Sequence, residues 1–170
     1  MASSVMFLPL RRLKSRVLHY VCSRQWETLY SSYGSRFQDL EDFLDGSKQA
    51  YKYMQNELCT ADSVSHLKTM VSDKLYEAIL LSLDEREEWR MENFDKGGLI
   101  FEDVEAYVEQ ISAPESFEVK ASLTADVSFL SAVRLESQPE EVMFRADGFV
   151  FETQWDPEQG IGEWKISSIY

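Results

Sequence analysis

The stretch from Phe117 to Phe129 alternates apolar and polar residues without interruption, and this pattern limits the fold more than any other in the chain. A β-strand points successive side chains to opposite faces of its sheet. The alternation therefore predicts one long strand with its apolar phase on a core and its polar phase in water. The inward phase is expected to hold Phe117, Val119, Ala121, Leu123, Ala125, Val127 and Phe129.

Further strands are predicted around this one. Ile100–Ile111 alternates less cleanly, and Trp164–Tyr170 forms a short last strand. Two more segments flank Asp147-Gly148, which predicts either a tight hairpin turn or a bulge; these segments are Val142–Ala146 and Phe149–Trp155. The Gly-Ile-Gly sequence at residues 160–162 predicts a turn before the last strand.

The first half of the chain has helical periodicity instead. Leu10–Cys22 predicts a basic helix with an apolar side made of Leu10, Leu13, Val17, Tyr20 and Val21. The clearest helix has Asp39 as its N-cap and an apolar face formed by Leu40, Phe43, Leu44, Ser47, Tyr51, Met54 and Leu58. A second stretch begins near Asp62 or Ser63 and buries Val64, Leu67 and Val71. A third, capped by Ser72, points Leu75, Ile79 and Leu83 inward and ends in the charged run Asp84–Arg90.

Helices followed by a run of antiparallel strands predict an α+β domain. We expect three or four helices, the longest near Leu40–Leu58, packed on one face of a curved antiparallel sheet of about four strands. The strand at 117–129 should be central. No apolar run approaches the ~20 residues that a membrane-crossing helix needs.

Charge divides the chain unevenly. The first 26 residues contain no Asp or Glu, whereas Glu27 and the residues after it hold all 30 acidic residues against 12 of the 17 basic ones. We therefore divide the chain into a basic leader and linker at 1–35 and an α+β domain at 36–170. The polar stretch Tyr30–Ser35 is the expected linker or cleavage region.

The basic leader has three interpretations. An Arg-rich, acid-poor amphipathic leader is typical of mitochondrial import signals. If it stays on the protein, it can lie on an anionic membrane surface, with Arg11, Arg12, Lys14 and Arg16 as the membrane-contacting residues. The third interpretation is a basic helix docked on the acidic domain.

Nothing in the sequence indicates a catalytic or metal site, and we predict no cofactor. His19, His66, Cys22 and Cys59 lack the spacing of metal ligands. Asp126 is a conceivable base, but its strand phase places it on the polar surface. An acidic domain also lacks the basic face that nucleic acid requires.

Aromatic residues allow two interpretations each. Phe149, Phe151, Trp155 and Trp164 either line a ligand cleft or fill the core, and we favour the core. Aromatic residues beside the basic helix either anchor it at a membrane interface or pack on the domain; these are Trp26, Tyr30 and Tyr33.

Three segments carry a family resemblance. Phe37 precedes Phe43-Leu-Asp-Gly-Ser-Lys-Gln-Ala-Tyr51, Leu67–Ile79 contains Leu-Tyr-Glu-Ala-Ile, and Phe151-Glu152 precedes Trp164-Lys-Ile-Ser-Ser-Ile169. In this order they resemble the cone-shaped, NTF-two-like domain of the Tim forty-four-like family. The import-motor tether, mitoribosomal protein L-forty-five and the matrix m-AAA protease-interacting protein are members. The family's presequence and coiled coil are expected to be missing, and the stretch from Val133 to Val142 is short.

The resemblance implies a non-enzymatic adaptor in the mitochondrial matrix, peripheral to the inner membrane. Its partners would be anionic lipid and a protein machine: the import motor, the mitoribosome or the m-AAA protease. The alternatives are a small-molecule carrier or enzyme that uses the cavity of the cone, or a binding module elsewhere in the cell.

Overall fold

The computed structural model describes residues 3–60, 64–82 and 98–170. Helical elements come first and strands follow, which confirms the α+β class. The helical elements are α1 (Ser3–Tyr33), η1 (Gly34–Arg36), α2 (Leu40–Thr60), η2 (Ser65–Thr69) and α3 (Asp73–Leu81). The strands are β1 (Leu99–Ser112), β2 (Ala121–Leu135), β3 (Gln138–Asp156), β4 (Gly160–Ile161) and β5 (Lys165–Ile169).

The five strands form one antiparallel sheet with β2 at its centre, as predicted. β2 lies between β1 and β3, while β4 and β5 both pair with β3. Val127 is opposite Val108 of β1 and Phe149 of β3, and all three are buried. β2 begins only at Ala121, so Val119 is exposed instead of inward.

β3 is continuous through Asp147-Gly148, so the predicted turn or bulge is wrong at this place. The register runs without a break from Phe129↔Asp147 to Ser128↔Gly148. Gly148 exchanges backbone hydrogen bonds with Tyr170, and a Cβ at this position would collide with the Tyr170 ring. A glycine is needed at position 148 because the Tyr170 ring lies close to the backbone there, and not because the chain turns.

Two other turns lie at residues for which no turn was predicted. The β2–β3 connection is the turn at residues 136–137. Gly160 and Ile161 are not a turn: they form β4, paired with Asp156 and Trp155. The turn before β4 lies at residues 157–159.

The core lies between α2 and the sheet. The predicted apolar face of α2 is buried there at Phe43, Tyr51 and Met54. The Tyr51 ring stacks on Phe129 with 4.4 Å between ring centroids. Asp39 caps the helix as predicted, because its Oδ1 accepts a hydrogen bond from the Glu41 N–H at 2.8 Å.

The segment after α2 buries Val64, Leu67 and Val71 as predicted, although it forms the 3₁₀ helix η2. The Ser72 side chain caps α3 by accepting a hydrogen bond from the Leu75 N–H at 3.3 Å. The remaining expected positions lie outside the described residues: Asp62, Ser63, Leu83, Asp84–Arg90 and Gly97.

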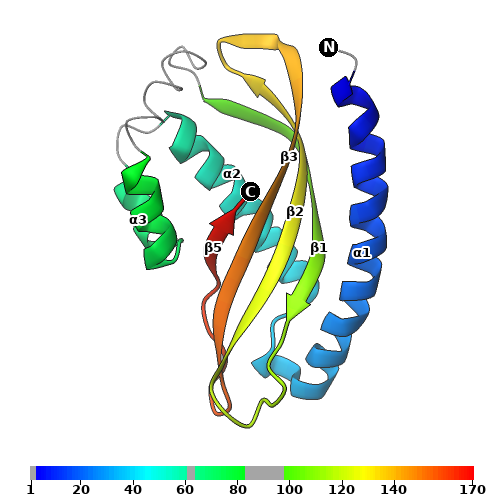
Figure 1. Ribbon diagram of the computed structural model, residues 1–170, viewed down its shortest axis with the longest axis vertical. Helices are drawn as coiled ribbons and strands as arrows, with labels where there is room; N and C mark the ends of the chain where they lie inside the picture. Colours follow the sequence, from blue (N-terminus) through cyan, green and yellow to red (C-terminus); the bar gives the residue numbers. More distant parts are fainter. Residues whose placement is uncertain (1–2, 61–63, 83–97) are drawn as a thin grey trace.

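The longest helix is α1 and not α2, contrary to expectation. α1 is helical through Tyr33 and ends at Gly34, whose φ of 58° suits a helix C-terminus. The predicted linker at 30–35 is therefore mostly helix. In Figure 1, α1 lies to the right of the strands, whereas α2 crosses behind them.

Candidate functional site

α1 contacts the sheet face opposite to α2, so the helices do not share one face. Its inner side reaches β1 residues of the polar phase. Arg12 Nε donates to Glu105 Oε2 at 2.8 Å, and Ser15 Oγ donates to Glu109 Oε1 at 2.5 Å. The His19 ring meets Tyr107 edge-on. Polar strand residues are covered because α1 lies over them.

The end of α1 is fixed in the main core. Trp26 is 1% exposed, stacks on Phe43 with 4.7 Å between centroids, and contacts Phe37. Its Nε1–H donates to the Gln38 carbonyl at 2.8 Å. Tyr33 packs on Trp155. These contacts match the packing interpretation of the two residues, while Tyr30 is exposed.

The outer side of α1 is an exposed apolar surface, which we call the outer stripe. Its residues lie at i, i+3, i+7, i+10 and i+11, so they occupy one side of the helix. Their exposed fractions are 58–68%. Contiguous exposed apolar patches are candidate interaction sites. The stripe consists of Leu10, Leu13, Val17, Tyr20 and Val21.

The four predicted membrane-contacting residues are exposed, but they have different surroundings. Arg12 is paired with Glu105. Arg16 lines a cleft beside the sheet. Among the described residues, Arg11, Lys14 and Arg16 have no ion-pair partner. Arg24 lies over the Tyr20 ring of the stripe and is 3.7 Å from the Glu27 carboxylate. The free cations thus border the outer stripe.

Carboxylates gather beneath α1. Asp126, expected at the surface, is half-buried there. Burial and the nearby Glu109 raise the pKa of the Asp126 carboxyl. Burial also raises the pKa of the Cys22 thiol and lowers that of His19. No sequence pattern predicted this cluster, because the alternation placed the polar strand phase in water.

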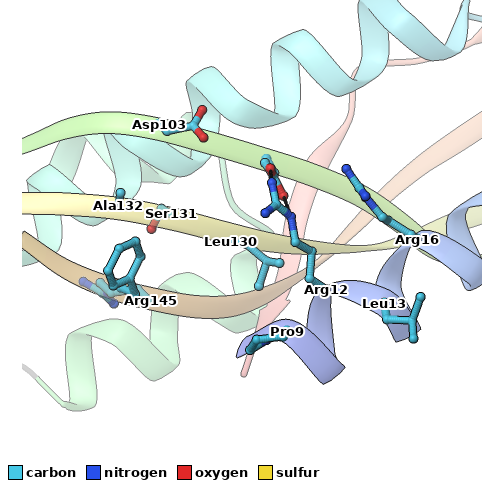
Figure 2. Close-up of a pocket in the computed structure, with 11 residues that line it drawn as sticks. Pro9, Arg12, Leu13, Arg16, Asp103, Leu130, Ser131, Ala132 and Arg145 are labelled. Carbon is cyan, nitrogen blue, oxygen red and sulfur yellow. Dashed lines mark hydrogen bonds and ion pairs between the residues drawn. The ribbon is translucent and has the colours of Figure 1, made fainter. Parts of the chain in front are cut away.

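A cleft of about 560 Å³ lies between the first turns of α1 and the sheet. Figure 2 shows Arg12 and Arg16 extending from α1 toward β1, with Leu130 of β2 beside Arg12. Its lining is mostly apolar with a few charged groups: Pro9, Arg12, Leu13, Arg16, Asp103, Glu105, Leu130, Ser131, Ala132, Phe144 and Arg145. Sequence reasoning missed it, because it forms only where α1 crosses the sheet.

A buried polar network links α2 to the sheet. The Tyr51 hydroxyl donates to Asp147 Oδ2 at 2.6 Å and lies 2.9 Å from Ser131 Oγ. Arg145 Nη2 lies 3.1 Å from Asp147 Oδ1. Burial and the Asp147 charge raise the pKa of Tyr51 well above its ordinary value, so the hydroxyl stays a hydrogen-bond donor. This arrangement fixes α2 on the sheet.

The aromatic residues weighed as a cleft lining form the core. Phe149, Phe151 and Trp155 are buried, and Trp164 packs against Phe43. Among the described residues, no group of three His, Cys, Asp or Glu side chains could hold a metal ion. No described helix is both long and apolar enough to cross a membrane.

No protein-family model matches the chain, and no curated protein matches it. Among solved structures, it is similar to the intermembrane space region of the chloroplast protein ARC6. The TM-score is 0.39 and the identity 14%, over 78% of this chain and 95% of that one. A similarity this distant says nothing about function.

Proposed function

We propose that this protein is a non-enzymatic adaptor of the Tim forty-four-like family on the matrix face of the mitochondrial inner membrane. α1 attaches it to anionic lipid, and the acidic body binds a protein machine: the import motor, the mitoribosome or the m-AAA protease. The outer stripe with its free cations carries the proposal. Its apolar residues suit insertion at a membrane interface, and its cations suit anionic headgroups.

The family assignment rests on three segments that pack together. Phe43 of α2 contacts Phe151 of β3 at 5.6 Å and Trp164 at 4.8 Å between ring centroids. Val71, from the second segment, forms a β-bridge with Ile166 of the last strand. The residues that carry the resemblance thus support one another in the core.

Retention of the leader is supported by Trp26. Cleavage near 30–35 would remove this buried ring from beside Phe37 and Phe43. N-terminal sequencing of the native protein tests this, and a mature N-terminus after Tyr30 would contradict membrane attachment through α1.

The non-enzymatic assignment is supported by the filled concave face. Tyr51, Phe129 and Phe149 are buried against one another between α2 and the centre of the sheet, where a cone cavity would lie. The rival enzyme needs an open pocket at this place with a buried carboxylate.

Vesicle flotation tests the membrane role. The full chain should float with cardiolipin-containing vesicles and far less with phosphatidylcholine alone. Each cation near such a surface contributes ~1 kcal/mol, so R11Q/K14Q/R16Q should weaken binding about a hundredfold. Added salt should also weaken it.

A matched pair of variants tests the stripe itself. L13E/V17E should abolish flotation, because these charges resist insertion. L81E is the control, since Leu81 of α3 is 89% exposed and lies outside α1. Equal flotation of wild type and L13E/V17E would overturn attachment through the stripe. Affinity purification from fractionated cells tests compartment and partner, and recovery with cytosolic proteins alone would overturn the adaptor proposal.

A further inference from the structure

The cleft under α1 has one cation that is not neutralised. Three arginines line it. Arg12 is held by Glu105, and Arg145 by Asp147. Arg16 has no ion-pair partner among the described residues and extends toward the strands (Figure 2). A free guanidinium beside an apolar cleft is a ready partner for an anionic group.

The carboxylates that line the cleft do not neutralise the Arg16 guanidinium. Glu105 is engaged twice, by Arg12 and by the Tyr107 hydroxyl at 2.7 Å. Asp103 is drawn away from Arg12 and Arg16 in Figure 2. The anion-binding end of the cleft therefore lies at Arg16.

The rest of the cleft is apolar. Leu130 and Ala132 of β2 lie on its sheet side, and Leu13 and Pro9 come from α1. Phe144 of β3 is 66% exposed at its rim. Ligand pockets of 300–1,000 Å³ are commonly apolar with a few orienting polar groups, and about 560 Å³ lies in this range.

We propose that this cleft binds a single amphiphilic anion, an apolar chain that carries one carboxylate or phosphate. The anionic group pairs with Arg16, and the chain lies along Leu130, Ala132 and Phe144. This site lies between α1 and the sheet and shares only Leu13 with the outer stripe, whose other four residues do not line it. The cleft encloses one molecule, whereas the outer stripe is proposed to contact a membrane surface. The inference about the cleft therefore does not depend on the proposed function.

Titration calorimetry of the full chain with laurate, below its critical micelle concentration, tests the site. We expect saturable binding of one laurate per chain, and similar binding of dodecyl phosphate. Dodecanol should bind at least about tenfold more weakly, because it lacks the charge that Arg16 recognises. Equal binding of dodecanol, or binding to anionic vesicles with none to free laurate, would overturn the proposal.

Variants place the site. R16Q should weaken laurate binding about tenfold. K14Q is the matched control: it removes the same charge from the same helix, but Lys14 does not line the cleft. A132F should block binding by filling the cleft, with thermal unfolding measured to show that the fold persists. Equal losses in K14Q and R16Q, or unchanged binding in A132F, would contradict a defined site.

Discussion

α1 and α2 both pack against the same sheet, yet their apolar residues are used in opposite ways. α2 buries its apolar face, with Phe43, Tyr51 and Met54 inside the core. α1 turns a mixed side with Ser15, His19 and Cys22 toward the sheet and leaves its apolar stripe in solvent. Apolar periodicity therefore identifies a helix, but it does not say which side a neighbour covers.

The difference follows from what each sheet face offers. The face under α2 presents aromatic and branched side chains. Burial of apolar surface therefore contributes most of the stability on this face. The face under α1 presents Glu105, Tyr107 and Glu109, which require hydrogen-bonding partners when covered. Arg12, Ser15 and His19 supply contacts to them, and the apolar residues of the outer stripe stay exposed.

The largest expected change in unfolding free energy comes from a comparison of two α1 variants. W26A should cost about 3–5 kcal/mol in free energy of unfolding, because it leaves a cavity among Phe37, Phe43 and Trp164. Y20A on the outer stripe should change it by no more than about 0.5 kcal/mol. Urea unfolding measures both. A large loss in Y20A would show that the stripe is covered within the fold.

The next largest effect concerns α2. Y51F removes the hydroxyl that meets Ser131 and Asp147, and leaving the buried Asp147 oxygen without this donor should cost about 1–3 kcal/mol. Y53F is the matched control on the same helix, since Tyr53 is exposed. Equal stability of Y51F and Y53F would mean that the network does not hold α2.

A smaller effect is expected where α1 meets β1. R12A breaks the pair with Glu105, in which the Arg12 side chain is 49% exposed. Solvent-exposed ion pairs contribute at most about 1 kcal/mol, so the loss should stay below that value. R16A should leave unfolding unchanged, and a loss above about 2 kcal/mol in R12A would show that polar contacts dominate the docking of α1.

The smallest effect is a pH dependence under α1. The folded-state pKa of Asp126 is raised, so the folded state binds more protons than the unfolded one above pH ~4. Stability should therefore fall as pH rises through the folded pKa. D126N should flatten this part of the curve in urea unfolding at several pH values. A curve that D126N leaves unchanged would show that burial and Glu109 do not make the ionised Asp126 carboxylate costly in the folded state.

Local patterns alone predicted much of this protein. The period-two pattern placed β2, and the spacing from Leu40 to Leu58 placed α2, because both depend on which side chains a single element points together. Asp39 and Ser72 were recognised as caps for the same reason. The predicted turn at Asp147-Gly148 failed because Gly148 is set by the Tyr170 ring, a neighbour distant in sequence.

The sequence by itself determined the α+β class, the central strand with its inward phase, and an apolar side and basic residues on the first helix. Only the tertiary structure decided that α1 continues to Tyr33, that Trp26 enters the core and that the outer stripe stays exposed. The packing of α1 on the sheet also forms the cleft at Arg16 and partly buries Asp126. The physical reason is that periodicity records the direction of side chains within one element, whereas burial depends on which other element arrives to cover them.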